Sequence, residues 1–214
     1  MTLLLFFSKS CNIFLDMERI SVYNILTREL KERGIKMNPW HDFKDERINI
    51  DNFVAVIEIT KGSKNKYELD KESGLLRLDR ILYTSTHYPA NYGFIPRTLS
   101  EDGDPLDVLV LCQEGLEPMS TVECFPIGMI NMVDENEADE KIIAIPLNDP
   151  FLNSYQDITD LPQHQFHEIK HFFEVYKYLE NKTTYVDKIC GRKEAIECIS
   201  KCKQAYYDEF VNKK

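Results

Sequence analysis

The sequence contains no long hydrophobic run, little glycine and no cysteine pair of the Cys-x-x-Cys type. No stretch of its 214 residues approaches 18 consecutive apolar residues, so we expect no transmembrane helix and no membrane partner. Eight glycines and nine prolines exclude a collagen-like or low-complexity chain. No basic residue precedes the apolar start at Met1–Phe7, which argues against a secretory signal. We interpret the six cysteines as reduced thiols, and together these features predict a cytoplasmic protein.

Basic residues are missing from one long window of the chain. Between Leu99 and Glu140 there are 12 acidic residues and no lysine or arginine, within a chain of 26 basic and 36 acidic residues. The net charge of −10 provides no general field that attracts phosphates, so we expect no nucleic-acid partner. Crowded carboxylates repel one another unless cations lie among them. The window is therefore either a solvated acidic face or a cation site.

The remaining pattern predicts many short strands followed by two helices. Strands are expected at Phe53–Thr60, at Lys66–Asp70 as the strand returning after a turn, and at Leu75–Leu82, Val108–Cys112, Cys124–Val133 and Ile142–Leu147. Residues 88–96 read as a turn-rich aromatic loop. Helical spacing of apolar residues predicts one helix over Pro162–Glu180 and a second that opens near Gly191. This order predicts a β-barrel or β-sandwich with packed helices.

The amino-terminal region stands apart from this pattern. A helix near residues 16–33 is expected, because Asp16 is a suitable cap and Gly34 a suitable stop. We therefore divide the chain into an extension of unknown role over residues 1–37 and a main domain over residues 38–214.

The densest chemical signal is Asp102-Gly103-Asp104-Pro105-Leu106-Asp107, directly before an expected buried strand. Glycine and proline force a tight turn, so three carboxylates converge at the mouth of that strand. Carboxylate oxygens suit hard cations such as Mg²⁺, Mn²⁺ or Ca²⁺. A calcium loop of the helix–loop–helix kind would need glycine at the sixth position and glutamate at the twelfth, where this chain has Asp107 and Gln113.

A second acidic cluster contains Asp134, Glu135 and Asp139, with Lys141 close behind. It resembles a hairpin loop that brings more carboxylates to the same site, although a solvated hairpin tip has the same pattern. Three histidines at helical spacing form a weaker alternative, because one helix face could hold zinc: His164, His167 and His171.

The segment DGDPLDV at residues 102–108 is similar to the D-x-D-P-x-D signature of the soluble family I inorganic pyrophosphatases. Further segments follow in the family's order over about residues 38–180, and the final helix matches loosely: VIEI, KYELDKESG, DR, YPANYGFIP, DENEADEK and HFFEVYKYLE. The resemblance is to the bacterial type, which implies a homo-oligomer, with a hexamer favoured over a dimer or trimer. It implies an α+β fold that is mainly β, a five-stranded OB-type β-barrel with packed C-terminal helices.

The resemblance also implies the reaction and the residues that carry it. Inorganic pyrophosphate would be hydrolysed to two orthophosphates by in-line attack of a metal-activated water, without a covalent intermediate. The cofactor would be Mg²⁺, several ions per site, with Mn²⁺ or Zn²⁺ as substitutes. Asp104 is the expected general base. The expected metal ligands are Asp102, Asp107, Asp134, Asp139 and Glu58, supported by Glu68 and Glu135. The expected pyrophosphate and phosphate contacts are Lys66, Arg80, Tyr88, Tyr92, Lys141, Tyr176 and Lys177.

Two other classes of protein would use the same residues differently. An oligonucleotide- or anion-binding module could stack bases on Tyr88, Tyr92 and Phe94, but the net charge opposes it. A structural protein could hold Ca²⁺ on the same acids without hydrolysing anything.

Overall fold

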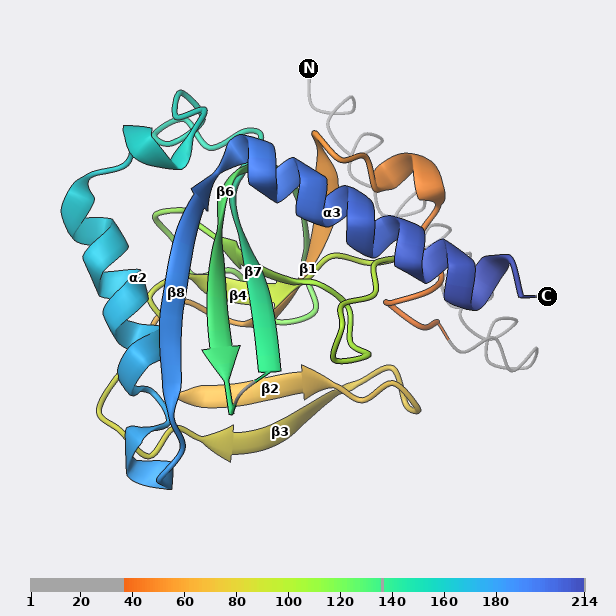
Figure 1. The fold of residues 1–214 in the computed structure, drawn as a ribbon. Helices are drawn as coiled ribbons and strands as arrows, with labels where there is room; N and C mark the ends of the chain where they lie inside the picture. Colours follow the sequence, from red (N-terminus) through yellow and green to blue (C-terminus); the bar gives the residue numbers. More distant parts are fainter. Residues whose placement is uncertain (1–36, 136, 214) are drawn as a thin grey trace, which may run out of the picture. The chain divides into compact units, whose positions relative to one another are not determined.

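The computed structural model describes residues 37–135 and 137–213 (Figure 1). The helix expected near residues 16–33 lies outside the described residues, as does nearly all of the proposed extension. The part from Asn38 onward forms one compact unit and is described by itself. In the described part of the chain, no helix is both long and apolar enough to cross a membrane.

Six strands form the main sheet, in the order β1-β4-β5-β7-β6-β8. Their bounds are Phe53–Ile59 (β1), Asn91–Phe94 (β4), Asp107–Val110 (β5), Thr121–Asp134 (β6), Glu137–Pro146 (β7) and Thr184–Gly191 (β8). β5 and β7 are parallel, and the other pairs are antiparallel. β6 also pairs with β1, so the hydrogen-bonded neighbours run in a ring through β1, β4, β5, β7 and β6.

A separate two-stranded sheet contains β2 (Asn65–Leu69) and β3 (Leu76–Ile81), and Figure 1 shows it below the ends of β6 and β7. Short 3₁₀ turns lie at Asp45–Arg47, Ile158–Asp160 and Tyr178–Glu180. The longer helices are α2 (Gln163–Val175) and α3 (Arg192–Tyr206), the latter followed by a π-helical turn at Tyr207–Val211.

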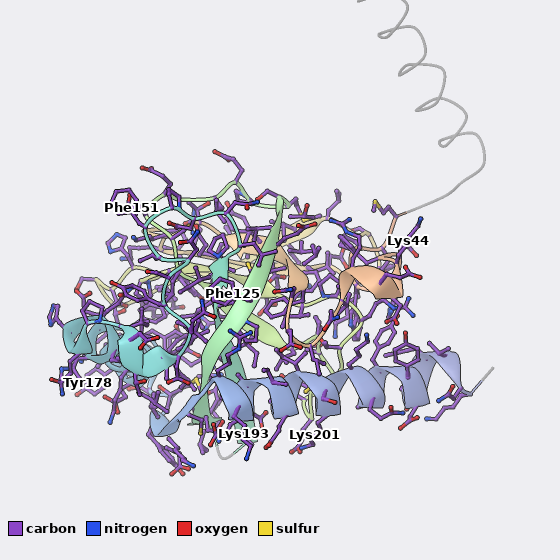
Figure 2. All side chains as sticks on the ribbon, turned by 90° about the horizontal axis from the view of Figure 1, so that it is seen from above. Lys44, Phe125, Phe151, Tyr178, Lys193 and Lys201 are labelled. Atoms are coloured by element: carbon purple, nitrogen blue, oxygen red, sulfur yellow. The ribbon has the colours of Figure 1, made fainter. Side chains whose placement is uncertain are left out.

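The two helices cover different parts of the sheet with their apolar faces. α2 buries Ile169, Phe172 and Phe173 and lies beside β8. α3 crosses β6 and buries Ala195, Ile199, Cys202 and Tyr206. Figure 2 shows Lys193 and Lys201 on the opposite face of α3, directed away from the sheet. This division follows the helical spacing of apolar side chains in the sequence.

The mainly β architecture with two carboxyl-terminal helices is confirmed. The strand expected at Phe53–Thr60 is β1, and all seven residues of β1 are buried, so both of its faces are covered. The expectation that β2 returns along β1 is wrong, since β2 pairs with β3. Two strands were missed, β4 within the supposed aromatic loop and β8 between the helices.

Gly93 explains why a turn-rich segment contains the short strand β4. It pairs with Ile57 of β1, and a Cβ atom added at Gly93 would lie 1.9 Å from the carbonyl oxygen of Val56. Any other residue would push the two strands apart, so here glycine permits pairing instead of marking a turn.

Candidate active site

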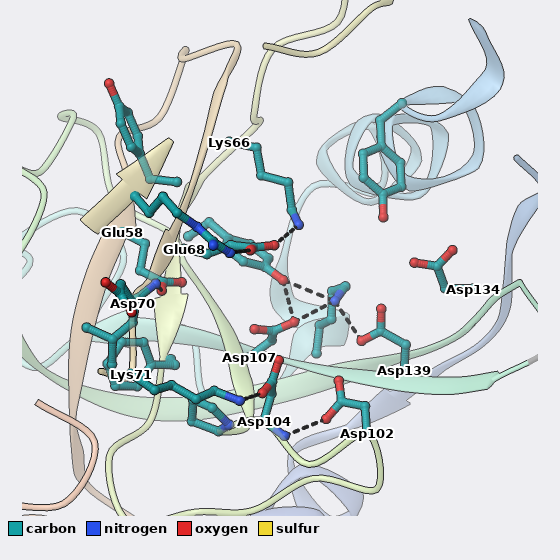
Figure 3. A pocket seen from close by; sticks show the side chains of 18 of the residues that line it. Glu58, Lys66, Glu68, Asp70, Lys71, Asp102, Asp104, Asp107, Asp134 and Asp139 are labelled. Atoms are coloured by element: carbon teal, nitrogen blue, oxygen red, sulfur yellow. Dashed lines mark hydrogen bonds and ion pairs between the residues drawn. The ribbon is translucent and has the colours of Figure 1, made fainter. Parts of the chain in front are cut away.

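A cavity of about 580 Å³ opens where the two sheets meet. Its walls come from the β2–β3 hairpin, the loop before β5, the β6–β7 hairpin and the end of α2 (Figure 3). Most of the residues predicted for the site line it: Glu58, Lys66, Glu68, Tyr92, Asp102, Asp104, Asp107, Asp134, Asp139, Lys141, Tyr176 and Lys177. Side chains from residues 58 to 177 of the chain thus meet at one place.

The loop before β5 is held by its own hydrogen bonds. Gly103 has φ +84°, a left-handed conformation that glycine adopts at little cost. The amide of Asp104 donates to Asp102 Oδ1 at 2.9 Å, and the amide of Ser100 donates to the carbonyl of Asp104 at 2.8 Å. Figure 3 shows Asp102, Asp104 and Asp107 gathered on one side of the cavity, as the tight turn in the sequence predicts.

Lys141 lies at the base of the cavity and is only 3% exposed. Its Nζ lies 2.7 Å from Asp107 Oδ2, 2.7 Å from Asp139 Oδ1 and 3.1 Å from Tyr92 Oη. The parallel register of β5 and β7 places Asp107 beside Lys141. Burial disfavours the ammonium charge, but Asp107 and Asp139 outweigh burial and raise the pKa of Lys141 well above its usual value.

Burial raises the pKa of several carboxyl groups in the cavity. Burial, with a contribution from Asp107, raises the pKa of Glu58 to about 8, although Leu69 donates its amide to Glu58 Oε1 at 2.7 Å. Burial also raises the pKa of Asp139 and Asp102, with Asp107 and Asp139 respectively adding repulsion. Asp134 pairs through Oδ2 with Lys177, but its Oδ1 is buried without a hydrogen-bond partner. The charged form of these acids is therefore disfavoured, and a bound cation would favour it.

Lys71 was not identified from the sequence. It forms an ion pair with Asp104, and its Nζ lies 5.1 Å from the centre of the buried Trp40 ring. Lys71 follows β2 in the turn toward β3, so this ion pair joins the small sheet to the loop before β5. The residue stands inside the quoted segment KYELDKESG, but nothing in its spacing distinguishes it from a solvated lysine.

Three of the expected residues do not line the cavity. Arg80 donates through Nε to Glu180 at 3.0 Å and also pairs with Asp79. Tyr88 is buried next to Tyr92, with ring centres 5.4 Å apart. Glu135 is exposed beyond the end of β6 and pairs with Lys182 at 2.7 Å.

The face of β3 that carries Arg80 is not fully buried, since Leu78 on the same face is 47% exposed. The carboxylates of Glu180 and Asp79 already provide Arg80 with anionic partners.

The described residues contain no group of three or more His, Cys, Asp or Glu side chains arranged to hold a metal ion. The helix-face zinc alternative is therefore not supported, and His164 lies 3.6 Å from Glu168 instead. Around the cavity, Lys141, Lys71 and Lys177 lie between the acids and act as their counter-ions. The oxygen-rich donor set, the raised pKa values and the unpaired Asp134 Oδ1 nevertheless fit hard divalent cations.

Comparison with known proteins gives one consistent family. The family model described as inorganic pyrophosphatase matches residues 55–207. Soluble inorganic pyrophosphatase 2 of Chlamydomonas reinhardtii is 49% identical over 85% of this chain and 95% of its own length. Soluble inorganic pyrophosphatase 1 of Arabidopsis thaliana is 47% identical over 86% of each chain.

Solved structures of similar fold belong to the same family of proteins. The inorganic pyrophosphatase of Helicobacter pylori superposes with a TM-score of 0.73 at 48% identity, covering 74% of this chain and 95% of that one. The Thermus thermophilus enzyme superposes with a TM-score of 0.71 at 43% identity, covering 73% and 91%. The sequence motif, the cavity and these relatives agree, and the chain belongs to the inorganic pyrophosphatase family.

Proposed function

We propose that this chain hydrolyses inorganic pyrophosphate to two orthophosphates with the help of divalent cations, Mg²⁺ in the first place. The observation that carries the proposal is the composition of the cavity wall, which has nine acidic and five basic side chains. A wall with this excess of acid repels a polyanion. Bound divalent cations reverse the sign of the charge at the cavity wall, so the same wall then binds pyrophosphate.

The residues suited to hold these cations are acids of the cavity wall, several of which have a raised pKa. Asp102, Asp107 and Asp139 would share one ion, with Asp107 contributing to a second. Asp134 and Glu58 would anchor ions that arrive with the substrate, with Glu68 and Glu135 in support. When bound, such cations neutralise substrate charge and make a nearby water more acidic, and Mn²⁺ or Zn²⁺ could substitute for Mg²⁺.

Asp104 is the proposed proton acceptor for the attacking water. It lines the cavity, and its side chain is about half exposed, so a water molecule can reach it. Its ion pair with Lys71 holds the carboxylate at the cavity wall. No serine, cysteine or histidine is among the described residues that line the cavity. This supports direct in-line attack by water without a covalent intermediate.

The cations and tyrosines of the cavity would bind the phosphoryl groups. Lys66, Lys141 and Lys177 line it, and their ammonium groups are already near the carboxylates that would hold the metals. Arg80 could join them if a phosphate replaced Glu180 or Asp79 as its partner. Tyr92 and Tyr176 present hydroxyl donors that add no charge, and Tyr88 packs behind Tyr92.

The proposal extends to the molecule as a whole. The ring of pairings through β1, β4, β5, β7 and β6 supports a five-stranded OB-type barrel. We further propose a catalytic domain over residues 38–214, a homo-oligomer with a hexamer favoured, and a cytoplasmic location. Sedimentation of the native protein tests the assembly.

The direct test is phosphate release from pyrophosphate by the purified full chain, with EDTA, Mg²⁺ or Mn²⁺. We expect release with either cation and none with EDTA. Asp104→Asn should lower kcat by about 100-fold or more, the scale of general-base loss. Asp187→Asn, on the exposed part of β8, is the matched control and should keep wild-type kcat. A folded chain inactive with both cations refutes the function, and an active Asp104→Asn variant refutes the role of Asp104.

A further inference from the structure

Two cysteines lie one helical turn apart on the inner side of α3, next to the loop that precedes β5. Cys198 and Cys202 are both free thiols, and each thiol shifts the pKa of the other, so the two side chains lie close together. Cys202 is 6% exposed and belongs to the hydrophobic core, whereas Cys198 is half-buried at the edge of that core. The pair therefore has one sulfur fixed in the interior and one that solvent reaches.

The buried thiol contacts the loop at two points. Cys202 Sγ lies 3.9 Å from Ser100 Oγ, and the carbonyl of Cys202 accepts the amide of Leu99 at 2.9 Å. Ser100 in turn donates its amide to the carbonyl of Asp104, and its own carbonyl accepts the amide of Gly103 at 3.1 Å. The thiol pair is thus separated by one residue, Ser100, from the turn that carries Asp102 and Asp104.

We propose that Cys198 and Cys202 form a binding site for thiophilic ions that accept two thiolate ligands, and that occupation of this site displaces the loop over residues 99–104. The second half of the proposal rests on the proposed function, because the displaced loop carries Asp102 and Asp104. Soft metals and trivalent arsenic share this chemistry, since both prefer thiolate sulfur to the oxygen ligands of the cavity.

The electrostatics of the pair favour such a ligand. The interaction with the Cys198 thiol lowers the pKa of Cys202. The same interaction, together with burial, raises the pKa of Cys198. The carboxylate of Glu140 is near both thiols and favours a bound cation, while Lys201 is engaged by Glu101 at 2.6 Å.

A monosubstituted trivalent arsenical provides a balanced test reaction. Each thiol loses its proton and forms one arsenic–sulfur bond, the arsenic–oxygen bond breaks, and the oxygen leaves with the two protons as water. Arsenic stays trivalent and sulfur is not oxidised, so no oxidant or reductant is required.

Bridging must move the two sulfurs relative to each other, because an atom has to enter a pair that is already in contact. Cys202 cannot withdraw into the close-packed core without cost, so its movement is transmitted to Ser100 and Leu99. A displacement of ~1 Å in a catalytic loop can lower turnover by up to about 100-fold. We therefore expect inhibition that added Mg²⁺ does not relieve.

The experiment uses phenylarsine oxide on the native full chain, in the presence of excess monothiol to suppress single-thiol adducts. Intact mass and the count of reactive thiols measure binding without reference to activity. The variants are Cys198→Ser and Cys202→Ala, and the matched control is Cys112→Ser, another half-buried free thiol outside α3. Cys198→Ser is the primary variant, because a half-buried position accepts a hydroxyl with little effect on folding.

We expect one adduct per chain with loss of two thiols in wild type and in Cys112→Ser, and none in Cys198→Ser or Cys202→Ala. In the bound wild type, kcat for pyrophosphate should fall about tenfold or more, and the Cys198→Ser variant should be resistant. Absence of the wild-type adduct, or its persistence in Cys198→Ser, overturns the site. An adduct that leaves kcat unchanged overturns the coupling to the loop. If the chain does not hydrolyse pyrophosphate at all, the mass measurement still shows whether Cys198 and Cys202 bind the arsenical.

Discussion

Replacing Lys141 with methionine should destabilise the metal-free protein and, at the same time, increase its stabilisation by Mg²⁺. The ammonium group of Lys141 is the only cation within 2.7 Å of Asp107 and Asp139 among the ion pairs of the described chain. Methionine has similar length but no charge, so two carboxylates lose their shared partner without a large cavity being left.

The size of the effect follows from the burial of the three groups. Lys141 is 3% exposed, and the side chains of Asp107 and Asp139 are 28% and 20% exposed. Removing one partner from a buried ion pair costs about 3–5 kcal/mol, and partial contact with water places this case at about 3–4 kcal/mol. For a chain of this size each kcal/mol lowers Tm by about 2–4 °C, so we expect a decrease of about 6–16 °C in EDTA.

Urea unfolding of wild type and Lys141→Met, in EDTA and in Mg²⁺, measures both effects. Because Lys141 repels a cation bound by Asp107 and Asp139, its removal should make Mg²⁺ more stabilising than in wild type. Lys170→Met is the control, since Lys170 faces Glu174 at 3.7 Å on the surface of α2 and should change stability by about 0.5 kcal/mol or less. A loss below about 1 kcal/mol in EDTA, or equal stabilisation of both proteins by Mg²⁺, would refute the electrostatic reasoning.

Three further predictions concern other parts of the site and its scaffold. Burial raises the pKa of Glu58 from 4.5 to about 8, so the free energy of unfolding of metal-free wild type should fall as the pH rises through this range. Glu58→Gln should remove this loss, which is on the order of 4 kcal/mol at pH 9 in urea unfolding, and equal pH profiles of the two proteins would contradict the assignment. Lys71→Met should lower kcat roughly tenfold with little change in KM, because Asp104 loses the partner that positions it, while Lys71→Arg should retain activity; unchanged kcat in Lys71→Met would show that the ion pair is incidental. Asp157 accepts the amide of Arg192 at 2.9 Å at the start of α3, so Asp157→Ala should cost about 1–2 kcal/mol at pH 7. The hydrogen bond from the Arg192 amide lowers the pKa of Asp157, so the difference should shrink as the pH falls below 3.8 and toward that lowered pKa. A difference that does not change between neutral and acidic pH would contradict this ionisation.

The local chemistry of the site could be predicted from the sequence because it depends on short-range order. Gly103 and Pro105 force a turn whatever surrounds them, so Asp102, Asp104 and Asp107 had to point toward a common region. The acids near Asp134 and Asp139 were predicted to lie on a hairpin, and β6 and β7 form that hairpin. The helical spacing in the last third of the chain identified both helices for the same reason.

Strand partners and burial, in contrast, depend on residues that are distant in the sequence. Nothing local shows that β2 pairs with β3 instead of β1, because the strands that pair with β1 are β4 and β6, which are distant in the sequence. The strand β4 contains Gly93, whose lack of a side chain signals a turn until the neighbouring backbone of β1 is known. Pattern analysis has no access to either fact.

By itself, then, the sequence determined which side chains are available for the site and the family to which they belong, because these follow from residue types and their order. Only the tertiary structure decided which charges face one another. Lys141 lies between Asp107 and Asp139 because β5 and β7 run parallel, Lys71 reaches Asp104 because the small sheet meets the loop before β5, and Cys202 lies beneath Ser100 because α3 crosses the sheet. Coulomb interactions and hydrogen bonds act over a few ångströms of space, and the distances between residues far apart in the chain exist only once it has folded.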